Sequence, residues 1–368
     1  MERVIRVTLL LLTAFFAVHT STGAITAINS REDYELCIKE MAMSLEEKRT
    51  VELAFVDLTQ FKKFIMTGTC DDYASDMRYF YGSNQKSIIL QFEWLDSTRV
   101  LAAAKNPALN RKVPLQTEKA AQELRKRMDR YKFKGMSRAE IVKAVYDDLI
   151  LRTKEIPVQQ SKTPCTNLLL RNRGYSESYC QCLFVTLTAL DIPCHVLPQY
   201  NFSLMVQLDN EEWYYLIPCR SVDSISSNPF KIDENGWISS KDKWLQTYPA
   251  LATENHVRLE QHETVDEFWK AAQKAYNAGN SAYGAVLARF PGKKKFMQSL
   301  DEYIAAGGMV PVEDMYLPGC AARNVYTRVM FTSEQGDVQE VDVLQNASPA
   351  KKSPKKSGKR FEKVRVAD

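Results

Sequence analysis

An apolar helical segment at 176–190 is followed at once by three short strand-like runs, and this succession constrains the fold more than any other feature of the sequence. The runs cover residues 194–197, 204–209 and 212–218, with the turn sequence DNEE between the last two. Consecutive strands with short connections usually lie side by side in one antiparallel sheet. We therefore predict that the helix packs on an antiparallel meander.

Helix and strand patterns alternate on both sides of this segment, which indicates an α+β protein. Two capping boxes, Ser137 with Glu140 and Thr264 with Glu267, mark the starts of helices. No internal repeat is evident in the sequence. We predict three domains, which are an N-terminal α/β domain at 25–135, a central core at 136–260 and a C-terminal α/β domain at 261–344.

The first 24 residues have the pattern of a secretory signal peptide. Arg3 and Arg6 precede an apolar run at 7–18, and small residues follow up to Ala24. The run is too short to span a bilayer, and no later stretch is apolar enough to do so. We expect a secreted or periplasmic protein of the cell envelope, with no membrane span after cleavage. An uncleaved signal anchor is the alternative.

The net charge of +4 hides an uneven distribution. The segment 345–368 carries eight Lys or Arg residues against two acidic ones, and it is poor in apolar residues. We predict that it is a disordered basic tail, either merely solvated or binding an acidic polymer. The remaining mature chain is slightly acidic, so its charge does not favour polyanion binding.

Neither a metal site nor a cofactor site is predicted. The eight cysteines lie after the expected cleavage point, but their spacing includes no Cys-x-x-Cys, and no His-x-x-x-His occurs. A glycine-rich phosphate loop is also missing from the sequence. Disulfides are permitted in an exported chain, with the pairing left open.

A stretch of about 80 residues resembles a known family. The sequence RGYSESYCQCLFVTLTALDIPCHVL supplies Gly174, Tyr179 and the Ile192–Pro193 pair, and VQLDNEEWYYLIP supplies Trp213 and Pro218. This pattern is similar to the transglutaminase-like core of the papain-type superfamily. The resemblance implies a helix packed on an antiparallel sheet, and exported bacterial proteins of this kind often carry flanking α/β regions.

The family's catalytic positions are degenerate in this chain. The resemblance implies a Cys at the start of the long helix, a His on the second strand and an Asp on the third. These positions hold Ser176, Asn201 and Ile217. Neither Asn201 nor Ile217 can act as a base or orient an imidazole. We therefore predict no catalytic residues at these positions, and we interpret Ser176 as a helix N-cap.

Three functions are compatible with these residues. The first is a catalytically inactive binding protein whose old cleft, with Ser176, Cys180, His195, Asn201 and Trp213, binds a protein, peptide or glycan. The second is an amide hydrolase or acyl transferase with a rearranged site, in which Ser176 or Cys180 works with His195. The third is a structural envelope scaffold. The sequence identifies neither the partner nor the oligomeric state.

Overall fold

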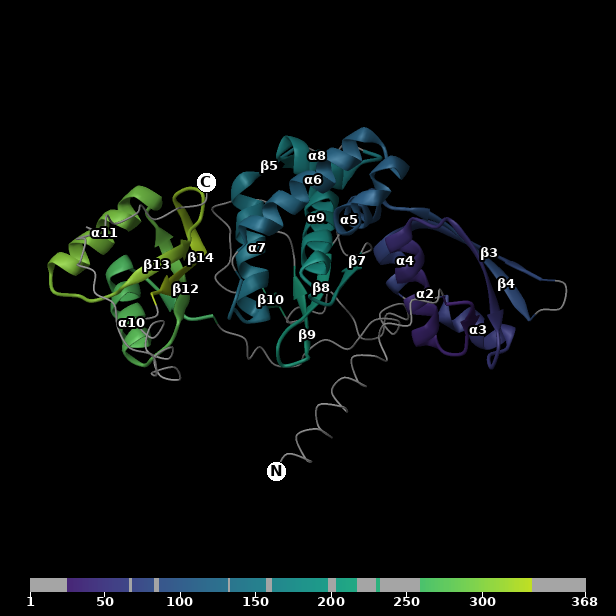
Figure 1. Ribbon diagram of the computed structural model, residues 1–368, viewed down its shortest axis with the longest axis horizontal. Helices are drawn as coiled ribbons and strands as arrows, with labels where there is room; N and C mark the ends of the chain where they lie inside the picture. Colours follow the sequence, from purple (N-terminus) through teal and green to yellow (C-terminus); the bar gives the residue numbers. More distant parts are fainter. Residues whose placement is uncertain are drawn as a thin grey trace, which may run out of the picture.

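The protein forms three units in a row, each with its own four-stranded sheet (Figure 1). The computed structural model describes residues 25–65, 68–82, 86–131, 133–156, 161–197, 203–216, 230–231 and 259–332. The predicted α+β class is confirmed. The predicted signal peptide and basic tail lie outside the described residues. Within the described residues, no helix has the length and hydropathy that crossing a bilayer requires.

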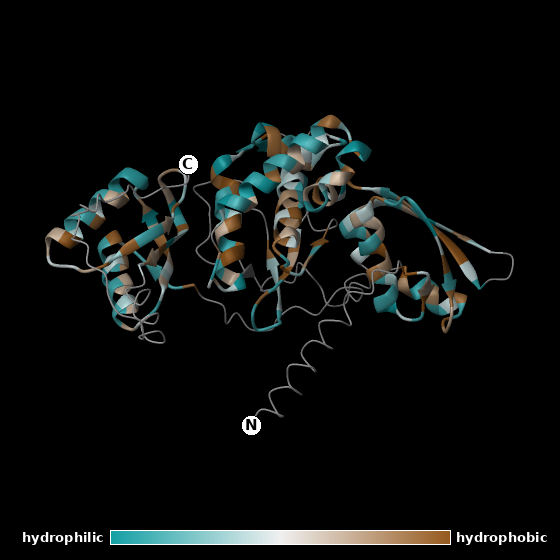
Figure 2. Ribbon diagram, viewed as in Figure 1, coloured by the Kyte–Doolittle hydropathy of each residue, from teal (hydrophilic) through white to brown (hydrophobic). Residues whose placement is uncertain are grey.

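The N-terminal unit has the sheet order β1-β2-β4-β3, with β1 parallel to β2 and the other pairs antiparallel. Its elements are β1 (Ala27–Ile28), α2 (Arg31–Ser44), β2 (Lys48–Leu53), α3 (Leu58–Phe64), α4 (Gly68–Tyr73), β3 (Ala74–Tyr81) and β4 (Ser87–Trp94). Along β4, buried residues alternate with more exposed ones, so one face of this strand is buried and the other is turned toward solvent. Figure 2 shows hydrophobic and hydrophilic residues mixed along β3 and β4.

The central unit contains the predicted helix on an antiparallel meander, with the strand order β10-β9-β8-β7. Its elements are α5 (Asp96–Lys105), η1 (Pro107–Lys112), α6 (Leu115–Arg130), α7 (Arg138–Arg152), β5 (Lys154–Glu155), α8 (Pro164–Arg171), β6 (Arg173–Gly174), α9 (Ser176–Ala189), β7 (Cys194–Leu197), β8 (Ser203–Gln207), β9 (Trp213–Leu216) and β10 (Phe230–Lys231).

The first predicted domain boundary differs from the structure. The sequence places α5 and α6 before a boundary at residue 135, but both helices contact α8, and α5 also contacts α9. The Asp96 carboxylate of α5 accepts two hydrogen bonds from Thr166 of α8, each 2.7 Å long. The central unit therefore begins near Asp96, because these helices cover α8 and α9.

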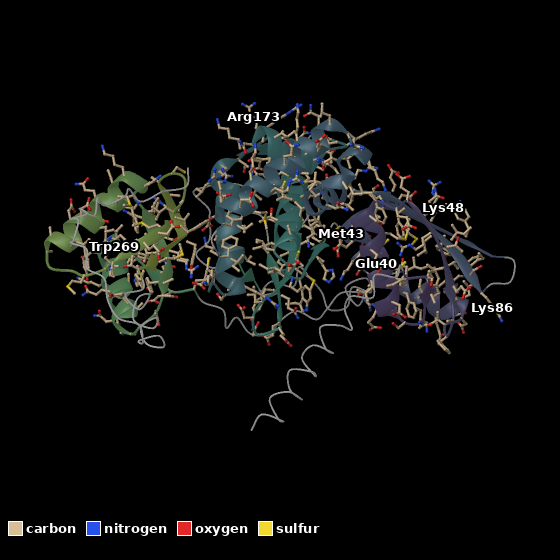
Figure 3. All side chains as sticks on the ribbon, in the orientation of Figure 1. Glu40, Met43, Lys48, Lys86, Arg173 and Trp269 are labelled. Atoms are coloured by element: carbon tan, nitrogen blue, oxygen red, sulfur yellow. The ribbon has the colours of Figure 1, made fainter. Side chains whose placement is uncertain are left out.

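The C-terminal unit has the sheet order β11-β12-β14-β13. Its elements are β11 (Gln261–His262), α10 (Val265–Asn277), β12 (Ala282–Phe290), α11 (Lys293–Ala305), β13 (Val312–Tyr316) and β14 (Ala322–Phe331). Trp269, labelled in Figure 3, is buried in this unit, and its Nε1 donates to Ser299 Oγ at 2.9 Å. The predicted capping boxes at Ser137 and Thr264 are both confirmed.

The two outer units share one topology, although no repeat is evident in the sequence. Both follow the order β-α-β-α-β-β, apart from the short α4 inserted in the first, and both pair their first two strands in parallel. Their third strands shift register at the same place, between Ala74 and Asp76 and between Val312 and Asp314. The shared topology gives no visible sequence repeat, because buried positions tolerate different residues of similar size and hydrophobicity.

A buried ion pair joins the C-terminal unit to α7. Lys143 Nζ lies 2.5 Å from Asp147 Oδ1 and donates to the Asn324 carbonyl of β14 at 2.6 Å. Asp147 Oδ2 in turn accepts the Tyr326 N–H at 2.7 Å. Burial raises the pKa of Asp147 to about 6, although the Lys143 ammonium acts in the opposite direction. The pair thus ties one helix to one strand through buried charges.

Replacing Lys143 by Met should lower the free energy of unfolding by about 3–5 kcal/mol, because the buried Asp147 then loses its counterion. The double variant Lys143→Met/Asp147→Asn should recover much of this loss, since Asn removes the charge and keeps an acceptor for the Tyr326 N–H. Urea unfolding followed by fluorescence measures both variants. A single variant as stable as the wild type would contradict this role of the pair.

Candidate functional site

The two faces of the central meander have different surroundings. Side chains alternate along each strand, and Cys194 of β7 faces α9, since its Sγ lies 3.5 Å from Thr188 Oγ1 and 3.8 Å from the Phe184 carbonyl. The inner face continues in the main core with Val196, Leu204, Val206, Tyr214 and Leu216. The outer face carries a separate cluster in which Trp213 and Tyr215 pack on Leu197 and Met205.

The start of α9 does not have the predicted serine cap. Tyr175 is the N-cap residue and its side chain makes no capping hydrogen bond, while Ser176 is the first residue of the helix. The interpretation of Ser176 as the N-cap is therefore wrong by one position. Gly174 precedes this turn, where an added Cβ would lie 2.7 Å from Ser178 Cβ. The backbone at Gly174 therefore packs directly against the first turn of α9.

Cys180 is a core residue rather than a nucleophile. Its side chain is fully buried, and its Sγ donates to the Ser203 carbonyl of β8 at 3.3 Å. Burial raises the pKa of this thiol well above its ordinary value. A nucleophilic cysteine needs an accessible thiolate, so this environment disfavours acyl transfer by Cys180.

His195 is held by an aspartate from the N-terminal unit. Its Nδ1 lies 2.7 Å from Oδ2 of Asp72 on α4, and the other oxygen of Asp72 accepts the Val196 N–H at 2.7 Å. The ring also stacks on Trp213, with centroids 5.0 Å apart and planes 27° from parallel. Asp72 therefore fixes both the ring orientation of His195 and one edge of the meander.

His195 alternates with Cys194 along β7, so its side chain lies on the outer face of the sheet, whereas the buried Cys180 of α9 contacts β8 from the inner face. The alternative enzyme site with Ser176 or Cys180 and His195 stays a prediction. Of the five predicted cleft residues, His195 and Trp213 are brought together. Asn201 and Ile217 lie outside the described residues.

Sequence reading missed Asp72, which is separated from His195 by 123 positions. It sits in a short acidic stretch, TCDDY, with no motif around it that marks a functional residue. Within the described parts of the chain, no three His, Cys, Asp or Glu side chains gather as metal ligands would.

The N-terminal sheet has a solvent-facing surface, here called the open face, formed by Lys48, Thr50, Arg78, Phe80, Ile89 and Gln91. Gln91 of β4 stands between Lys48 and Arg78, and Ile89 stands between Thr50 and Phe80. Phe80 is 49 % exposed, and Lys48, labelled in Figure 3, belongs to the same sheet. A basic row therefore lies beside an apolar row on a solvent-exposed surface.

The corresponding face of the C-terminal repeat is covered by α7. The shared bulge aligns Gln91 with Arg328 and Ile89 with Tyr326. Tyr326 OH donates to Glu140 Oε1 at 2.6 Å, and Tyr316 OH donates to the Ala144 carbonyl at 2.9 Å. An added Cβ on Gly284 would lie only 1.9 Å from the Tyr326 hydroxyl. One copy of this sheet face thus receives a helix closely, and the other is open.

Neither the family models nor the curated proteins compared with this chain match it. The resemblance of residues 137–218 to a transglutaminase-like core accordingly stays a prediction from sequence.

Replacing Asp72 by Ala should lower the free energy of unfolding by roughly 2–3 kcal/mol, because the buried Val196 N–H and the partly buried His195 ring lose their shared partner. The Val196 amide should also exchange its hydrogen faster. Asp72→Asn, which keeps an acceptor oxygen, is the matched control and should have a smaller effect. Native-state hydrogen exchange measures the amide directly, and unchanged protection in Asp72→Ala would contradict the role given to this carboxylate.

Proposed function

We propose that this chain is a binding protein with a catalytically inactive, transglutaminase-like core, and that the open face binds a helical segment of a protein partner. One observation carries the proposal. The same sheet face occurs twice in the molecule, and in the C-terminal copy a helix of the chain itself lies on it. The predicted signal peptide supports a location in the cell envelope or outside the cell.

The central unit supports the inactive part of the proposal. Acyl transfer needs a nucleophile within hydrogen-bond reach of a base, about 3.2 Å, or joined to it through one water. The thiol of Cys180 is buried on the inner face, and the imidazole of His195 is held by Asp72 on the outer face. The sheet itself separates the two groups.

The size of the open face suits one helix better than a second copy of the protein. Strands β3 and β4 have eight residues each, which corresponds to a length of about 26 Å. The three strands β2, β4 and β3 that carry this face span about 10–14 Å, so the face covers roughly 260–370 Å². A stable dimer buries about 800 Å² on each partner. Helix α7, with its 15 residues, is about 22 Å long, which matches the sheet.

The chemistry of the open face defines the helix that it would accept. The apolar row of Thr50, Ile89 and Phe80 favours an apolar stripe at helical spacing. The basic row, with Lys48 and Arg78, favours a carboxylate beside that stripe. Arg78 is paired with Asp76 at 2.9 Å, but both side chains are largely exposed, so this pair costs little to exchange. We therefore propose an amphipathic helix with an acidic flank as the ligand.

No transglutaminase, amidase or peptidase turnover above background is expected from the purified mature protein. The test uses amine-donor and peptide substrates with the wild type, Ser176→Ala and His195→Ala. Turnover that disappears in either folded variant would reveal a working nucleophile and overturn the inactive assignment.

Phe80→Glu should abolish capture of the partner from an extract of the source cells, because it places a charge in the apolar row. Ile304→Glu is the matched control, since Ile304 is 48 % exposed on α11, far from the open face. Crosslinks from Lys48 should also fall within one helical segment of the captured protein. Equal capture by both variants, or Lys48 crosslinks outside a helix, would contradict the proposal.

A further inference from the structure

Two buried cysteines of the central unit have their sulfur atoms in contact. Cys165 lies in the first turn of α8 and Cys182 lies on α9, and their Sγ atoms are 3.5 Å apart. The Cys182 thiol also approaches the Cys165 carbonyl at 3.5 Å. Both side chains are completely buried. The two thiols therefore face each other across the contact between two helices.

The fold enforces this approach from two directions. Gly174, in the connection between α8 and α9, has no room for a side chain, because an added Cβ would lie 2.8 Å from Leu168 Cδ1. Asp96 holds the start of α8 through its two hydrogen bonds with Thr166, the residue after Cys165. The position of Cys165 against α9 is thus fixed by packing on one side and by a buried carboxylate on the other.

We propose that Cys165 and Cys182 form a disulfide when the chain folds in an oxidising environment. The two S–H bonds break and one S–S bond forms. A small-molecule disulfide such as oxidised glutathione takes up the two electrons and two protons and is cleaved to two thiols. The sulfur atoms must approach from 3.5 Å to about 2.05 Å, a shift that both side chains can share.

The exchange takes place before α8 closes on α9. Burial raises the pKa of the Cys165 thiol well above its ordinary value in the folded protein. Exchange needs a thiolate that the oxidant can reach, which the unfolded or partly folded chain provides. The disulfide is therefore made during folding and then sealed in the core.

The neighbouring cysteines have other partners. Cys180 donates to the Ser203 carbonyl, and Cys194 lies next to Thr188. Among the cysteines that the structure describes, Cys165 and Cys182 make the only sulfur–sulfur contact. The inference is independent of the proposed binding function, because it concerns the core of the central unit and not the open face.

Peptide mapping without reductant tests the proposal. The full chain is refolded with oxidised glutathione, denatured, treated with iodoacetamide and digested with trypsin. We expect peptide 163–171 to be joined to peptide 174–220, with a mass two hydrogen atoms below the sum of the two thiol forms. The second peptide contains four cysteines, so variants are needed to identify the linked one. Cys182→Ala should abolish the link, and Cys180→Ala should keep it.

A second measurement works even if Cys182→Ala folds poorly. Dithiothreitol should lower the urea midpoint of the oxidised wild type and of Cys180→Ala, because reduction opens the closed loop. Recovery of peptide 163–171 from the oxidised wild type as a separate peptide with Cys165 alkylated would show that this thiol was free, and would overturn the proposal. So would a link that persists in Cys182→Ala.

Discussion

The rest of the structure depends on the complete burial of α9. Every residue from 178 to 187 is buried, so the helix needs neighbours on all sides. The meander covers one side, and α5, α7 and α8 cover the others. Some of these elements precede α9 in the sequence and others follow it. The burial of α9 therefore requires the whole central unit to pack around this helix. The outer units then attach to the elements that surround α9.

Each outer unit is attached through a buried carboxylate. Asp72 of the N-terminal unit binds the Val196 N–H on β7, an edge strand whose open backbone groups could otherwise pair with another chain. Asp147 of α7 binds the Tyr326 N–H of the C-terminal unit. Buried acceptors of this kind demand particular partners, because a misplaced unit would leave them unsatisfied. Apolar packing alone would specify these joints less strictly.

Local patterns made the central fold predictable, whereas the site required distant contacts. The apolar run of α9, the three strand-like runs and the capping boxes at Ser137 and Thr264 are signals within a few residues, and the structure confirms them. The bond between Asp72 and His195 joins positions far apart in sequence, and alternation along β7, not spacing, decides that His195 faces away from α9.

The shared topology places the same sheet face in two different surroundings, against α7 in the C-terminal unit and exposed in the N-terminal unit. In the C-terminal copy, a side chain at Gly284 would collide with the Tyr326 hydroxyl, which donates to Glu140 of α7, so a change at one of these positions disturbs the others. In the N-terminal copy, Phe80 is 49 % exposed and Ile89 is partly exposed. One copy of the topology thus serves as an internal joint, whereas the corresponding face of the other copy is exposed, and this is where we propose that a partner binds.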